Sequence, residues 1–63
     1  METKDTKQCI KEVAYYLQNA KSSLNDALSS VERPENKQQI QNDFKVVDGA
    51  LQNVITTLSN FMD

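Results

Sequence analysis

One short segment decides the fold: SSVERPEN, residues 29–36, which contains the only proline of the 63-residue chain, Pro34. Proline cannot continue a helix, and it disfavours helical geometry in the residue before it. A helix that arrives from the N-terminal side must therefore end at about Glu32 or Arg33. Proline suits the first turn of a new helix, where the negative charge of Glu35 also suits the helix dipole. The segment predicts a short turn between two helices.

Apolar residues follow a seven-residue repeat on both sides of this turn, with spacings that alternate between three and four. Such spacing places all of them on one stripe of an α-helix. A short connection makes the two helices antiparallel neighbours, so we expect the two stripes to pack against each other. The stripe consists of Ile10, Val13, Leu17, Ala20, Leu24, Ala27, Val31, Ile40, Phe44, Val47, Leu51, Val54, Leu58 and Phe61.

The predicted fold is all-α: an antiparallel two-helix hairpin that forms one domain over residues 1–63. We expect the first helix over about residues 4–31, the turn over about 32–34 and the second helix over about 35–61. Thr3 or Thr6 is the expected N-cap of the first helix, because a threonine hydroxyl can accept a bond from a free backbone N–H. Asn36 and Gln39 could instead form a capping box, which would start the second helix slightly later.

Size and composition suggest that the hairpin needs help to be stable. A chain this short buries a small share of its surface, and such domains commonly rely on disulfides, a metal ion or a partner chain. Cys9 is the only cysteine and the chain has no histidine, so an intrachain disulfide is impossible and a metal site is poorly supported. We expect no cofactor, and we expect a partner chain.

Two sets of residues flank the stripe on opposite sides. The first set, called the Ile55 face below, comprises Ala14, Lys21, Leu28, Asp48, Ile55 and Met62. The second set, the Tyr16 face, comprises Cys9, Tyr16, Ser23, Ser30, Asp43, Ala50 and Thr57. Lys21 and Asp48 are expected to pair across the helix–helix contact.

Large apolar side chains on the Ile55 face are left uncovered by the hairpin itself. We therefore expect this face to be the interface of a homodimeric four-helix bundle. This predicted interface widens toward Phe61 of the stripe, and its residues are Ala14, Leu28, Ile55, Phe61 and Met62. An amphipathic helix of another protein is the alternative partner.

The sequence offers no constellation for catalysis. Nucleophilic catalysis needs an activated nucleophile beside a base, and neither a histidine nor a glycine-rich phosphate loop is present. Cys9 is interpreted as a small residue at the edge of the helix contact. We expect a non-enzymatic protein.

The charge pattern argues against nucleic acid and membranes. Net charge is −2, and the lysines near the N-terminus alternate with acidic residues, which makes nucleic acid an improbable partner. The longest uncharged stretch, residues 49–62, is too short and too polar to cross a bilayer, and the N-terminus lacks the apolar run of a signal peptide. We expect a cytoplasmic protein.

The Tyr15–Tyr16 pair and Gly49 each allow two interpretations, a contact with another protein or a local structural role. Tyr15 and Tyr16 could form a docking handle, or they could be one packed and one exposed tyrosine. Gly49 falls in the middle of the second helix on the side away from the first helix. A close approach by another chain would explain it, and so would simple tolerance on a solvent-facing surface.

The layout of the chain resembles three groups of helical hairpins. In length and architecture it is similar to the Rop family of plasmid copy-number proteins, which implies a dimeric four-helix bundle and, as an alternative function, RNA binding. The stretch from Leu17 to about Leu58 is similar to short uncharacterised Firmicute proteins of the same shape, which implies a bacterial source. The small hairpin chaperones of type III secretion also look alike, which implies a chaperone or adaptor. Similar residues in the Firmicute pattern fall at Leu17, Ala20, Ser23, Leu24, Lys37 and Gln41.

Overall fold

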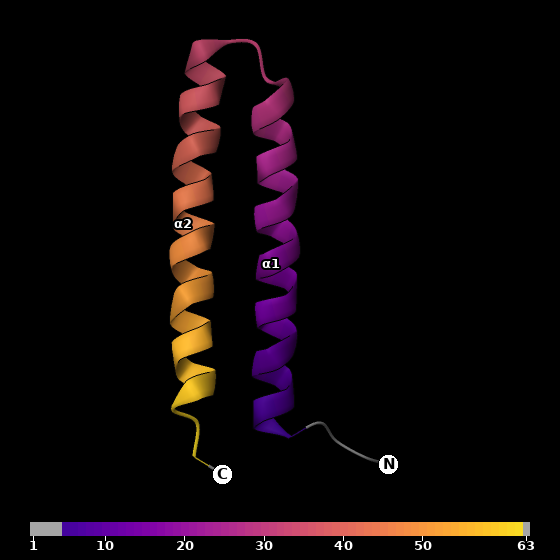
Figure 1. Ribbon diagram of the computed structural model, residues 1–63, viewed down its shortest axis with the longest axis vertical. Coiled ribbons are helices and arrows are strands. Elements are labelled where there is room, and N and C mark those ends of the chain that lie inside the picture. The colour runs from indigo at the N-terminus through magenta and orange to yellow at the C-terminus, as the bar shows by residue number, and fades with distance from the viewer. Residues whose placement is uncertain (1–4, 63) are drawn as a thin grey trace.

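Two long helices packed side by side make up the molecule. The computed structural model describes residues 5–62, with α1 at Thr6–Ser30 and α2 at Pro34–Ser59. The helices run antiparallel and are joined by residues 31–33, which confirms the predicted helical hairpin (Figure 1). The principal extents of the hairpin are 48 × 25 × 12 Å, so it has two broad faces and two narrow edges.

Asp5 caps the N-terminus of α1. The backbone N–H of Gln8 donates a hydrogen bond of 2.7 Å to Asp5 Oδ1, and Asp5 itself has extended geometry. Thr6 is the first helical residue, so the prediction that Thr6 caps the helix is wrong, while Thr3 lies outside the described residues. A carboxylate both accepts this bond and suits the positive end of the helix dipole, which favours Asp5 over its threonine neighbour.

The turn lies one residue earlier than expected at both of its ends. The N–H of Val31 donates to the carbonyl of Ala27 at 3.0 Å, but Val31 has left helical geometry and ends α1. Pro34 is the first residue of α2, since its fixed φ angle and missing N–H are both compatible with a helix start. The later start from an Asn36 capping box is therefore wrong.

The C-terminus of α2 falls two residues before the expected position. Ser59 is its last residue, and the N–H of Asn60 donates to the carbonyl of Thr56 at 3.1 Å. The N–H of Phe61 then donates to the carbonyl of Leu58 at 3.4 Å, which is a tighter turn than an α-helix makes. Phe61 thus follows the helix rather than belonging to it, yet its side chain is half-buried.

The core is a single thin strip between the helices. Leu51 is the only buried residue among residues 5–62, with an exposed fraction of 3%. Twelve of the fourteen stripe residues are half-buried, and Val13 is exposed. Two helices can cover only one side of each other, so the stripe packs as predicted but keeps partial contact with solvent along its length.

Candidate interaction surface

An ion pair crosses the helix contact at the middle of the Ile55 face. Lys21 Nζ of α1 lies 2.7 Å from Asp48 Oδ1 of α2, as predicted from the sequence. The Asp48 oxygen is itself shielded from solvent, and the lysine ammonium is the group that compensates its charge. The two side chains remain 30% and 39% exposed, so the pair stabilises the monomer by no more than about 1 kcal/mol.

Lys21 also covers an aromatic ring. Its Nζ lies 5.7 Å from the centroid of the Phe44 ring, within the range of a cation–π contact. The sequence-based expectations did not include this contact. One lysine of α1 thus contacts both a carboxylate and an aromatic ring of α2.

The residues of the Ile55 face on both sides of this ion pair are apolar. Ala14 and Leu28 are half-buried, and each is seven residues from Lys21 on α1. Ile55 is seven residues from Asp48 on α2, with 43% of its surface exposed, and Met62 is 89% exposed. Seven residues are two helical turns, so these side chains lie on the same face as the ion pair.

The Tyr16 face is more open and more polar. Of its residues only Ala50 is half-buried, and the others are exposed. Tyr15 and Tyr16 are both 66% exposed and touch edge to face with centroids 6.2 Å apart, so Tyr16 is not the packed tyrosine that one sequence interpretation expected. The small and polar residues of this face offer nothing large enough to cover its ring.

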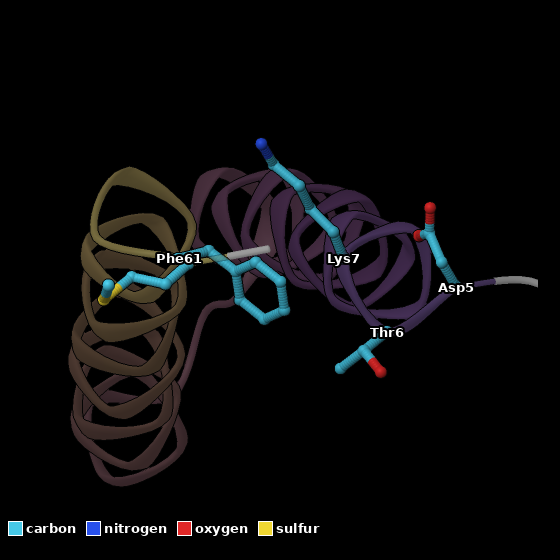
Figure 2. Close-up of a pocket in the computed structure, with 5 residues that line it drawn as sticks. Asp5, Thr6, Lys7 and Phe61 are labelled. Atoms are coloured by element: carbon cyan, nitrogen blue, oxygen red, sulfur yellow. The ribbon is translucent and has the colours of Figure 1, made fainter.

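A shallow hollow opens at the end of the hairpin where α1 begins and α2 ends. Its volume is about 550 Å³, and it is lined by Asp5, Thr6, Lys7, Phe61 and Met62. Figure 2 shows the Phe61 ring reaching toward the first turn of α1, where Thr6 and Lys7 lie. Of the predicted interface residues, Phe61 and Met62 therefore line this open end, while Ala14, Leu28 and Ile55 lie further along the hairpin.

Charge is unevenly distributed along the hairpin. From Lys21 and Asp48 toward the open end, α2 carries no charged residue through Met62, and α1 carries none until Glu12. From the ion pair toward the turn, acidic and basic residues alternate on α2, whereas α1 carries only Asp26. The uncharged segments include the exposed Ile55, and a lack of charge is typical of the centres of protein interfaces. Met62, in contrast, lies at the open end beside Asp5 and Lys7.

The described part of the chain was also considered for a metal site, a membrane-spanning helix and a disulfide. Within residues 5–62, no three His, Cys, Asp or Glu side chains come together in a way that could hold a metal ion. Neither α1 nor α2 has a stretch long and apolar enough to cross a membrane. The thiol of Cys9 is exposed and forms no disulfide.

Comparison with known proteins gives no family for this chain. No family model matches it, and neither the curated proteins nor the solved structures contain a significant match.

Proposed function

We propose that this protein is a non-enzymatic assembly module that self-associates through its Ile55 face into a four-helix bundle. The observation that carries the proposal is the incomplete core. Leu51 alone is buried among the described residues, while Ile55 and Met62 expose large apolar side chains to solvent on the Ile55 face. A second hairpin laid on this face would cover both side chains and the open edge of the stripe.

The energetic reason is the small amount of surface that two helices can hide from each other. Burying a large aliphatic side chain completely contributes about 1.5–3 kcal/mol, and half-buried stripe residues deliver only part of that. Domains of this size reach stability with added staples, of which a second copy is one. The Ile55 face is continuous with the half-buried stripe. A partner that covers this face would therefore also complete the burial of stripe side chains next to it.

Ile55→Asp tests this proposal. A carboxylate at the centre of an apolar interface would have to lose its hydration without a partner, so the dimer should dissociate. We expect size-exclusion chromatography with light scattering to give twice the 7.2 kDa chain mass for the unmodified protein and one chain mass for the variant.

Val46→Asp is the matched control. Val46 is also an aliphatic residue of α2, it is 71% exposed, and it lies outside the Ile55 face. This variant should remain dimeric and helical by circular dichroism. Equal dissociation of both variants, or a monomeric unmodified protein that is fully helical and melts cooperatively, would contradict the proposal.

An amphipathic helix of another protein is the competing occupant of the same face. That alternative predicts a chain that is monomeric and weakly helical alone and gains helicity when its partner is added. A Rop-like role predicts instead that the protein retains RNA at low salt and releases it as salt rises. Mass and helicity of the purified protein, followed by an RNA gel shift, separate these alternatives from self-association.

A further inference from the structure

We propose that the two hairpins stack in parallel, Ile55 face on Ile55 face, with their turns at the same end of the bundle. This inference rests on the proposed self-association and specifies its symmetry. In this arrangement the two-fold axis runs along the length of the hairpins. Each α1 then lies against the α2 of the second copy, and each residue of the face meets the same kind of residue that it already faces within its own hairpin.

The ion pair distinguishes this stacking from the other symmetric one. In the parallel stack, Lys21 lies opposite Asp48 of the second copy, and Asp48 lies opposite its Lys21. The four charges therefore alternate in sign around one layer. In the antiparallel stack, α1 lies against α1 and α2 against α2, so both lysines share one helix pair and both aspartates share the other. The 2.7 Å Lys21–Asp48 pair thus favours the parallel arrangement by charge complementarity.

The shape of the side chains next to this layer agrees with the same stacking. Ala14 and Ile55 each lie seven residues from the ion pair toward the open end, so they face each other across one hairpin. In the parallel stack the exposed Ile55 meets the small Ala14 of the second copy, and the reverse contact forms on the other side of the axis. Large-on-small contacts of this kind let helices approach closely and interdigitate.

The dimensions of the hairpin require that its whole broad face be used. A stable interface buries about 800 Å² on each partner. The broad face extends over 48 × 25 Å, whereas the narrow edge is only 12 Å across. A full-length stack of two broad faces approaches the needed area, and an edge contact or a short terminal overlap does not. The parallel stack keeps the full length without any shift in register.

A distance measurement between the two turns tests the arrangement. Cys9 is the only thiol and is exposed, so Cys9→Ser with Glu32→Cys moves the single labelling site to the turn. Double electron–electron resonance on the spin-labelled dimer should give a turn-to-turn distance well below the 48 Å length of the hairpin. A distance close to or above that length would show antiparallel stacking and overturn the inference.

A mixing experiment tests whether the ion pair lies in the interface. Lys21→Glu makes this layer wholly acidic and Asp48→Lys makes it wholly basic, so each variant alone should bind its own copy roughly tenfold or more weakly. An equimolar mixture should restore dimers as heterodimers, detected by native mass spectrometry. Loss of dimers without recovery on mixing would overturn the proposed layer.

Failure of the underlying proposal would look different. If the unmodified protein sediments as a monomer, self-association itself is wrong, whereas a dimer with distant turns contradicts the parallel stacking alone. Circular dichroism of each variant shows whether a dimer is missing because the helices are lost. The doubly charge-exchanged variant, Lys21→Glu with Asp48→Lys, should dimerise like the unmodified protein, because the charges around the layer still alternate in sign.

Discussion

Gly49 is a residue whose helical conformation costs stability without a packing benefit. It lies within α2 and is exposed, and a Cβ atom added to it would meet nothing within 4 Å. Alanine loses less backbone freedom than glycine on entering a helix, so Gly49→Ala should stabilise the fold by about 1 kcal/mol. We expect the melting temperature to rise by about 4–8 °C, as measured by circular dichroism.

The same substitution tests whether another chain approaches Gly49 closely. Gly49 lies away from the Ile55 face, so Gly49→Ala should leave the oligomeric mass unchanged. A loss of dimers together with intact helices would show that the contact between chains passes over Gly49 instead.

Asp5 illustrates how a single side chain fixes the start of a helix. Removing its carboxylate frees the N–H of Gln8, so Asp5→Ala should cost about 1 kcal/mol, and about 2 kcal/mol at most. Asp5→Asn retains an accepting oxygen and should cost much less, and Thr6→Ala should have little effect. Urea unfolding followed by circular dichroism measures all three, and a larger effect at Thr6 than at Asp5 would contradict this assignment of the cap.

The sequence did not allow a prediction of which residue, Asp5 or Thr6, caps α1. Both residue types cap helices, and they are adjacent, so composition alone does not say which of them leaves helical geometry. The structure decides it through the 2.7 Å bond from Gln8. The helix ends at Ser30 and Ser59 differ from the expected ends by only one or two residues. Several neighbouring residues can end a helix with similar energies, so the sequence does not select one of them.

At the scale of the helices, Leu51 holds the centre of the contact. It is the only buried residue in the described part of the chain, so Leu51→Ala should cost about 2–5 kcal/mol and is expected to abolish cooperative unfolding in a domain this small. Val46→Ala on the same helix removes an exposed side chain and should change stability by no more than about 0.5 kcal/mol. Urea titration of both variants makes the comparison, and equal costs would show that Leu51 is not the centre of the core.

The pairing of α1 with α2 was predictable because two strong signals agree. The seven-residue repeat selects the packed stripe, and Pro34 fixes the point at which the chain reverses. Together they place Lys21 opposite Asp48, and the structure confirms that pair. The exposure of Val13 and Tyr16 was not predictable in the same way, since a repeat assigns each residue to a side of the helix but says nothing about how much the facing residue covers.

For the molecule as a whole, packing of the two helices does not explain why large apolar side chains remain exposed beside the ion pair. One face combines an ion pair at its centre with the exposed apolar side chains of Ile55 and Met62, and a single hairpin leaves these apolar groups in water. The self-association that we propose would remove these apolar groups from water together. The sequence indicates such a partner by the surplus of apolar residues, while the symmetry of the pairing depends on the geometry of Lys21 and Asp48.

Sedimentation equilibrium of the unmodified, reduced protein over a wide range of concentrations tests the central claim most directly. The account predicts a reversible rise from one to two times the 7.2 kDa chain mass, with helicity and thermal stability increasing over the same concentrations. The linked rise in stability is expected because a partner that binds only the folded chain stabilises it by mass action. A single chain mass at every concentration, with full helicity and cooperative melting throughout, would contradict it.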